Sequence, residues 1–127
     1  MATPQLQKLG IVPGTRWALA NAADDWEFEQ PPDAALRVPD GADADVVVAF
    51  IHAADELEQT LDRLEQSIFP AGALWIAWPR RAAGHVSDLT DTVVRDAALR
   101  RKLVDTKVAA IDTNWSGLKL VWRKQYR

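Results

Sequence analysis

The sequence predicts a three-layer α/β fold in which helices cover both faces of a mostly parallel sheet. An antiparallel hairpin is expected at the C-terminal end of this sheet. Residues 45–51 and 73–78 are two apolar stretches without polar alternation, typical of strands covered on both faces in a parallel sheet. Apolar residues at helical spacing join them, which predicts a right-handed βαβ unit. Two more strand-like stretches follow near the end of the chain. At 127 residues we expect one domain, spanning 1–127.

A short helix is expected to open the chain. Thr3 is predicted as its N-cap and Pro4 as its first residue, and Gly10 lies just past its end. Pro13-Gly14 then predicts a type II turn, because proline presets one backbone dihedral and glycine tolerates the positive one that follows.

The first strand is predicted at residues 16–20 and belongs to the same sheet. From 21 to 44 the composition shifts to Asp, Pro and Glu, with one brief extended piece at 36–38. This segment is therefore predicted to be the least structured part of the chain.

Helices and a hairpin are predicted in the second half. The crossover helix carries its apolar residues at Ala54, Leu57, Leu61, Leu64 and Ile68, and Pro70 and Gly72 end it. Thr90 is expected to cap a later helix whose inner face is Val93, Val94 and Ala97. Residues 107–112 and 118–124 are then predicted as two strands joined by 113–117.

Composition excludes several classes of function. The net charge of −3 and the pI of about 5.3 argue against a nucleic-acid binder, which draws most of its affinity from basic groups. Without cysteine there is no disulfide framework, thiolate metal site or cysteine nucleophile. No apolar run approaches the ~20 residues that span a bilayer, and the first residues do not resemble a signal peptide. We therefore expect a cytoplasmic protein without a membrane partner.

Two stretches resemble landmarks of class I, Rossmann-type methyltransferases. Residues 9–19 resemble the helix, Pro-Gly turn and first strand of that family, and residues 45–78 resemble its fourth strand, helix, turn and fifth strand. More narrowly, the motifs at 75–81, 87–90 and 115–118 look like the small bacterial proteins grouped as domain of unknown function 3052. The resemblance implies a Rossmann-like fold and brings no functional residues with it.

The chain departs from those methyltransferases at the cofactor loop. They carry a glycine-rich turn after the first strand, where the backbone approaches the cofactor, and an acidic residue further on that binds the ribose. Residues 19–26 contain no glycine, and Asp40 is a candidate for the acid. The segment between the first two long strands is also too short for the usual strands and helices. We therefore expect no S-adenosylmethionine in the usual mode, and no cofactor.

Candidate binding residues follow from the rule that ligands of open α/β sheets lie beyond the carboxyl ends of the strands. The expected rim consists of Asn21, Asp24 and Asp25 after the first strand, His52 after the central one, Arg80 and Arg81 after the next, His85 beyond them, and Asp112 and Trp115 at the hairpin. Arg80 and Arg81 are the preferred anion binders, since guanidinium groups recognise phosphate and carboxylate. The alternative is a solvated pair of loop charges, with or without a salt bridge to Asp24 or Asp88.

The other candidates each have a structural alternative. His52 and His85 are either general bases or residues of ordinary loops. Ser87 is explained by capping and Ser116 by a turn, and two isolated histidines predict no metal site. Trp26 and Trp115 are either loop anchors or contacts for a partner or ligand.

Three hypotheses on function follow. The preferred one is a non-catalytic binding or regulatory module that uses the rim for an anionic small molecule or a protein partner. The second is a small enzyme with His52 or His85 as base and Arg80 and Arg81 as anion clamp. The third is a homo-oligomer or complex subunit that assembles through the edge of the closing hairpin.

Overall fold

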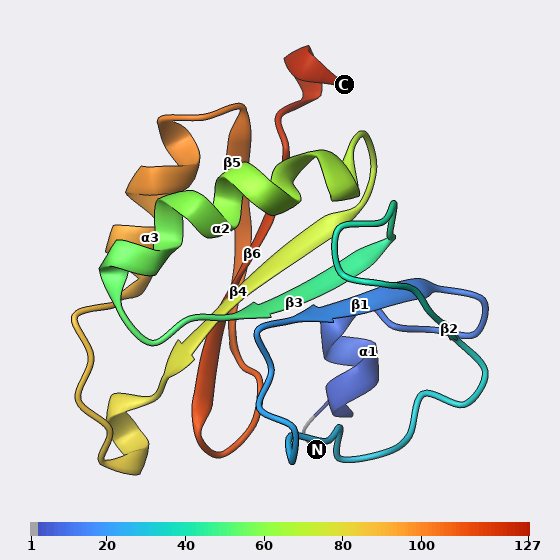
Figure 1. Cartoon of the computed structure of the whole chain (residues 1–127), viewed down its shortest axis with the longest axis horizontal. Coiled ribbons are helices and arrows are strands. Elements are labelled where there is room, and N and C mark those ends of the chain that lie inside the picture. The colour runs from blue at the N-terminus through green and yellow to red at the C-terminus, as the bar shows by residue number, and fades with distance from the viewer. Residues whose placement is uncertain (1–2) are drawn as a thin grey trace.

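Two uninterrupted apolar stretches form the middle of the sheet in the computed structural model, which describes residues 3–127 (Figure 1). They are β3 (Val46–Phe50) and β4 (Ala73–Pro79), which run parallel with Val48 opposite Trp75. Every residue of β3 is buried, and so is all of β4 except Pro79. Strands covered on both faces need no polar alternation, which explains the sequence pattern.

Four further strands complete a six-stranded sheet: β1 (Arg16–Ala20), β2 (Leu36–Arg37), β5 (Leu103–Ala110) and β6 (Trp115–Trp122). The order across the sheet is β2-β1-β3-β4-β6-β5. The first four strands pair in parallel, whereas β6 pairs antiparallel with both β4 and β5. The predicted fold class, a mostly parallel sheet with a closing hairpin, is confirmed.

Helices α2 (Leu57–Leu64) and α3 (Asp91–Leu99) cover one face of the sheet (Figure 1). The 3₁₀ turns Ala54–Glu56 and Glu65–Ile68 extend α2 over the whole predicted crossover segment. As expected, the Thr90 hydroxyl accepts the Val93 N–H at 3.2 Å and caps α3.

The turn between α2 and β4 passes close to the start of β3. A Cβ at Gly72 would lie 2.7 Å from the carbonyl oxygen of Ala44, so only glycine fits there without a backbone shift.

The opposite face is covered by α1 (Gln5–Leu9) and by the segment that follows β1. Thr3 was expected to cap α1, and that expectation is wrong. The carbonyl of Pro4 accepts the Lys8 N–H, so Pro4 itself is the N-cap and no side chain caps the helix. Gly10 ends α1 in the left-handed conformation, as its position predicted.

The hairpin strands are longer and earlier than the sequence predicted. The expected boundaries, 107–112 and 118–124, are wrong because the connection is only residues 111–114. The Asp112 carboxylate accepts the N–H groups of Asn114 and Trp115 and so closes the turn. Ser116 consequently lies in β6, opposite Trp78 of β4, and not in a turn.

Strand β5 forms one edge of the sheet. Its pairing with β6 shifts register between Asp105 and Lys107, and Lys107 is exposed. A bulge and an exposed lysine both discourage the addition of another strand. In the described part of the chain, no helix is long and apolar enough to cross a membrane.

Candidate functional site

The turn after β1 lies where the methyltransferase-like fold would have its glycine-rich loop. Asn21 takes a positive φ of 60°, the only non-glycine residue among 3–127 to do so. Asparagine tolerates this conformation better than most residues do, so the turn forms without a glycine at this position. Ala22, Ala23 and Asp24 follow with side chains in place of the hydrogens that would let a ligand reach the backbone.

Aromatic side chains pack together beside this turn. We call Trp26, Phe28, Phe50 and Trp115 the aromatic shelf. Trp26 packs against both Phe28 and Phe50 with ring centroids 4.9 Å apart, and Phe50 meets Trp115 at the same distance. The Trp26 indole N–H also donates to the Asp112 carboxylate at 2.9 Å. Trp26 and Trp115 are therefore anchors of the fold.

The residues of this region do not fit S-adenosylmethionine in the mode that the resemblance implies. The shelf fixes the segment after β1 to the end of β3 and to the hairpin turn. Asp40, the candidate for the ribose-binding acid, pairs with Arg63 of α2. Among residues 3–127, the turn after β1 thus has no glycine for a close backbone approach, and the acidic candidate Asp40 is already paired.

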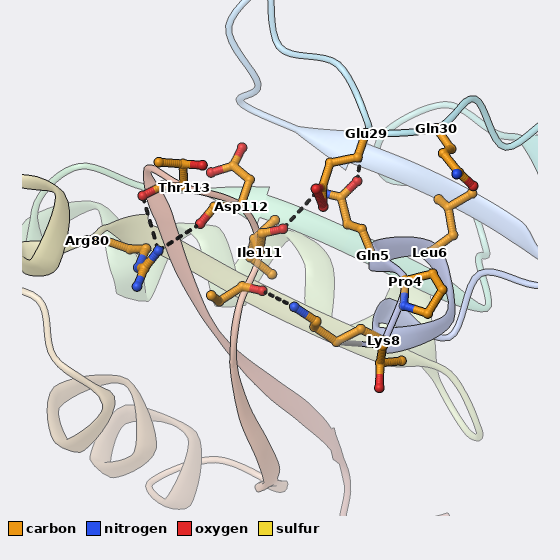
Figure 2. Close-up of a pocket in the computed structure, with 12 residues that line it drawn as sticks. Pro4, Gln5, Leu6, Lys8, Glu29, Gln30, Arg80, Ile111, Asp112 and Thr113 are labelled. Atoms are coloured by element: carbon orange, nitrogen blue, oxygen red, sulfur yellow. Dashed lines mark hydrogen bonds between the residues drawn. The ribbon is translucent and has the colours of Figure 1, made fainter. Parts of the chain in front are cut away.

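A cavity of about 400 Å³ opens between α1 and the β5–β6 turn (Figure 2). Its lining residues are Thr3, Pro4, Gln5, Leu6, Lys8, Glu29, Gln30, Arg80, Ala110, Ile111, Asp112 and Thr113. We call it the α1–hairpin cavity. It lies at the carboxyl ends of the strands, on the α1 side of the sheet.

Side chains from both walls of this cavity bind main-chain carbonyls of the hairpin (Figure 2). The Gln5 amide donates to Ile111 O at 2.8 Å, and the Lys8 ammonium donates to Ala110 O at 3.0 Å. From the other side, Arg80 Nη1 donates to the carbonyls of Asp112 at 3.3 Å and Thr113 at 3.2 Å. Lys8 and Arg80 thus bring two cations to one cavity.

The two arginines after β4 differ in their surroundings. Arg80 is half-buried and bonded to carbonyls, and in residues 3–127 neither arginine forms the expected bridge to Asp24 or Asp88. Asp88 instead accepts the Ala54 N–H at 2.9 Å. Arg81 is exposed and lines a separate cavity of about 460 Å³ on the α3 side.

The side chains of the two histidines lie outside the cavities that the arginines line, although the His85 N–H donates to the Arg80 carbonyl at 3.3 Å. The exposed His52 lies edge-on against Trp115 with ring centroids 5.3 Å apart. His85 is also exposed, and its Nε2 lies 3.1 Å from Asn114 Oδ1. Neither histidine lines the α1–hairpin cavity or the one beside Arg81. Asn21 and Asp24 are exposed and line neither cavity.

Sequence reasoning missed Gln5, Lys8 and Glu29 as residues of the rim. The signal for the first two was a spacing of three residues, which places them on the same face of a helix. Nothing in the sequence indicated that this face meets the hairpin about a hundred residues later. Across the part of the chain that the structure describes, no three His, Asp or Glu side chains are placed to hold a metal ion.

The comparisons with known proteins show the fold. No protein-family model matches the chain, and no curated protein matches it in sequence, so the likeness to domain of unknown function 3052 rests on its motifs. A NADB-Rossmann superfamily protein of Streptococcus agalactiae matches at TM-score 0.55 and 10% identity, over 96% of this chain and 69% of that one. The M1A22 tRNA methyltransferase TrmK of B. subtilis matches at TM-score 0.55 and 9% identity, over 97% of this chain and 67% of that one.

A third solved structure, LepI in complex with SAM, matches at TM-score 0.55 and 8% identity. The match covers 95% of this chain, which spans 47% of LepI. Identities this low show the fold alone. The chain therefore has a Rossmann-type, methyltransferase-like fold.

Proposed function

We propose that the chain is a non-catalytic binding module that holds a small carboxylate- or phosphate-bearing molecule in the α1–hairpin cavity. One observation carries the proposal. Lys8 and Arg80 line this cavity from opposite walls, and neither has an acidic side-chain partner in residues 3–127. Their carbonyl partners fix the side chains in place and leave further N–H groups of each cation to bind an anion.

The acidic residues of the cavity are compatible with an anionic ligand. The Asp112 carboxylate already accepts three donors, the indole of Trp26 and the N–H groups of Asn114 and Trp115. Such bonds spread its negative charge over the turn. Glu29 is exposed, so water screens its charge.

A non-catalytic role is supported by the position of the candidate bases. His52 and His85 lie outside the cavity, and a general base has to reach the proton that it removes. The aromatic shelf fixes the loop that would hold a methyl donor, which also favours binding over catalysis at this site.

Thermal unfolding with pyrophosphate and with citrate tests the proposal. A ligand at about a hundred times its Kd stabilises a protein by roughly 2.7 kcal/mol, which raises Tm by several degrees. We expect this rise in the wild type and its loss in Lys8→Ala and Arg80→Ala. Arg81→Ala is the matched control, because it removes a neighbouring arginine outside the cavity. S-adenosylmethionine is expected to leave Tm unchanged.

Two results would contradict the proposal. If Arg81→Ala abolished the rise as fully as Arg80→Ala, the anions would be responding to general surface charge. The second result is a rise in Tm with S-adenosylmethionine that becomes larger in Trp26→Ala. The region after β1 would then bind the cofactor, and the protein would be an enzyme rather than a non-catalytic module.

A further inference from the structure

The mild net charge of the chain conceals a strong separation of charge along it. Residues 21–45 contain eight acidic side chains and one basic one, whereas residues 100–127 contain eight basic side chains and two acidic ones. The start of β5 pairs with the end of β6, Leu103 opposite Trp122, so much of this basic segment gathers at one end of the sheet (Figure 1). That end lies away from the α1–hairpin cavity.

We define the C-terminal basic surface by Lys102, Arg123, Lys124, Tyr126 and Arg127. The Lys102 ammonium lies 5.4 Å and the Arg123 guanidinium 5.2 Å from the centre of the Tyr126 ring. Cation–π contacts of this kind hold both cations beside one exposed aromatic ring.

Within residues 3–127, the cations of this surface have no acidic partner. In the described residues 3–127, none of its four basic side chains forms an ion pair, and the guanidinium groups of Arg123 and Arg127 bind only the carbonyls of Arg101 and Trp122. Arg101 is different, because it pairs with three carboxylates of the α2 segment. Gathered like charges without counter-charges create a positive potential that attracts an anionic partner.

Apolar side chains adjoin these cations. A cavity of about 460 Å³ lies among Glu65, Gln66, Leu99, Arg100, Arg101, Lys102, Trp122, Arg123 and Tyr126. Leu99 at its edge is 45% exposed and Tyr126 is 38% exposed. Phe69, which is 42% exposed, packs on Trp122 with ring centroids 4.9 Å apart. The surface therefore offers a partner both positive charge and apolar contact.

We propose that the C-terminal basic surface docks an acidic peptide segment of a partner protein, with an apolar side chain of that segment in the cavity beside Leu99 and Tyr126. The cations would pair with its carboxylates. A peptide is favoured over a nucleic acid because the eight acidic groups of residues 21–45 would repel a long polyanion, whereas a short segment contacts only this end. The site is separate from the α1–hairpin cavity and does not depend on it.

Fluorescence anisotropy with the intact chain tests the proposal. The probe is a labelled peptide of glutamates interrupted by leucines, compared with the same peptide carrying glutamine for glutamate. We expect the acidic peptide to bind, with affinity that falls as salt rises, and the glutamine peptide to bind at least about tenfold more weakly. In Lys124→Glu/Arg127→Glu the affinity for the acidic peptide should fall by about tenfold or more.

A matched variant separates this surface from general charge. Arg37→Glu/Arg81→Glu changes the net charge equally at two exposed positions, on β2 and after β4, and should bind the acidic peptide nearly as the wild type does. Equal losses in the two variants would overturn the proposal. So would tighter binding of a single-stranded oligonucleotide or of phosphatidylserine vesicles with the same sensitivity to Lys124→Glu/Arg127→Glu. Salt-sensitive self-association that this variant abolishes would also overturn it, because the occupant would then be a second copy.

Discussion

The two faces of the sheet are covered by different means. On one face, α2 and α3 pack a core rich in aliphatic side chains, including Leu61, Leu64 and Val94. On the other, five residues of α1 and the irregular segment after β1 cover a core in which Trp17, Phe50 and Trp75 are buried. Four of the six tryptophans of the chain belong to this second face.

The difference shows how a sheet stays covered where helices are missing. A helix contributes a stripe of apolar side chains together with backbone groups that are already hydrogen-bonded. An irregular segment places fewer side chains over the same area of the sheet, so each side chain has to cover a larger part of it. Aromatic side chains bury about 150–250 Å² each, which makes them efficient for this purpose. The four tryptophans of this face therefore compensate for its lack of long helices.

The two faces should also differ in local stability. Cavities lie on both: the α1–hairpin cavity and one of about 500 Å³ beside Trp26 and Trp115 on the face without long helices, and two of about 460 Å³ near α3 on the other. Irregular segments open locally at lower free energy than packed helices and strands do. The following variants test whether the two faces differ in this way.

The largest effect is expected under the helices. Leu61→Ala removes a fully buried side chain of α2 and should lower the free energy of unfolding by roughly 2–5 kcal/mol, since the surrounding core only partly closes the cavity. Urea unfolding followed by circular dichroism measures it. Leu36→Ala is the control, because Leu36 on edge strand β2 is 59% exposed and its truncation should change stability by less than about 0.5 kcal/mol. Equal losses in the two variants would show that α2 does not hold the core.

A smaller and more local effect is expected on the other face. Trp26→Phe keeps an aromatic ring on Phe50 but loses the bond to the Asp112 carboxylate, which should cost about 1–3 kcal/mol. Hydrogen exchange should become faster in residues 21–35 and unchanged in α2 and α3. Trp115→Phe is the matched control, since no hydrogen-bond partner of its indole N–H is found in residues 3–127. Faster exchange across the whole sheet would mean that the two faces unfold together.

The strands and helices were predictable where burial alone decides the pattern. The apolar stretches of β3 and β4, the spacing of α2 and the capping of α3 by Thr90 all follow from local chemistry. The hairpin was placed several residues too late, because the turn depends on a carboxylate of Asp112 that bonds the next N–H groups rather than on a glycine. Side chain to backbone bonds of this kind leave little trace in periodicity.

The candidate site was predictable only in part. The rule for open α/β sheets selected Arg80, Asp112 and Trp115, all of which lie at the rim. It could not select Lys8, because that contact joins α1 to the hairpin across 102 positions. Nor could it separate Arg80 from Arg81, since their difference lies in the carbonyls that Arg80 meets.

The smallest expected effect depends on pH and belongs to the helix-covered face. Arg101 follows α3 and binds Glu58, Asp62 and Glu65 of the α2 segment. Its hydrogen bond lowers the pKa of Glu58 from the ordinary value of 4.5, against the opposing effect of burial. A carboxylate whose pKa is lower in the folded state stabilises the fold above its unfolded pKa, and this contribution is lost as pH falls through the folded pKa.

Glu58→Gln should therefore lower stability at pH 7 and have little effect once the pH is below the folded pKa of Glu58. The Glu58 side chain is 53% exposed, so solvent screening should hold the difference at pH 7 to about 1 kcal/mol or less. Urea unfolding at neutral and at acidic pH measures it. Glu27→Gln is the control, because Glu27 is exposed in the irregular segment and lacks an ion-pair partner among residues 3–127. If both variants changed stability alike, the Arg101 contacts would contribute nothing beyond general charge, and packing alone would distinguish the two faces.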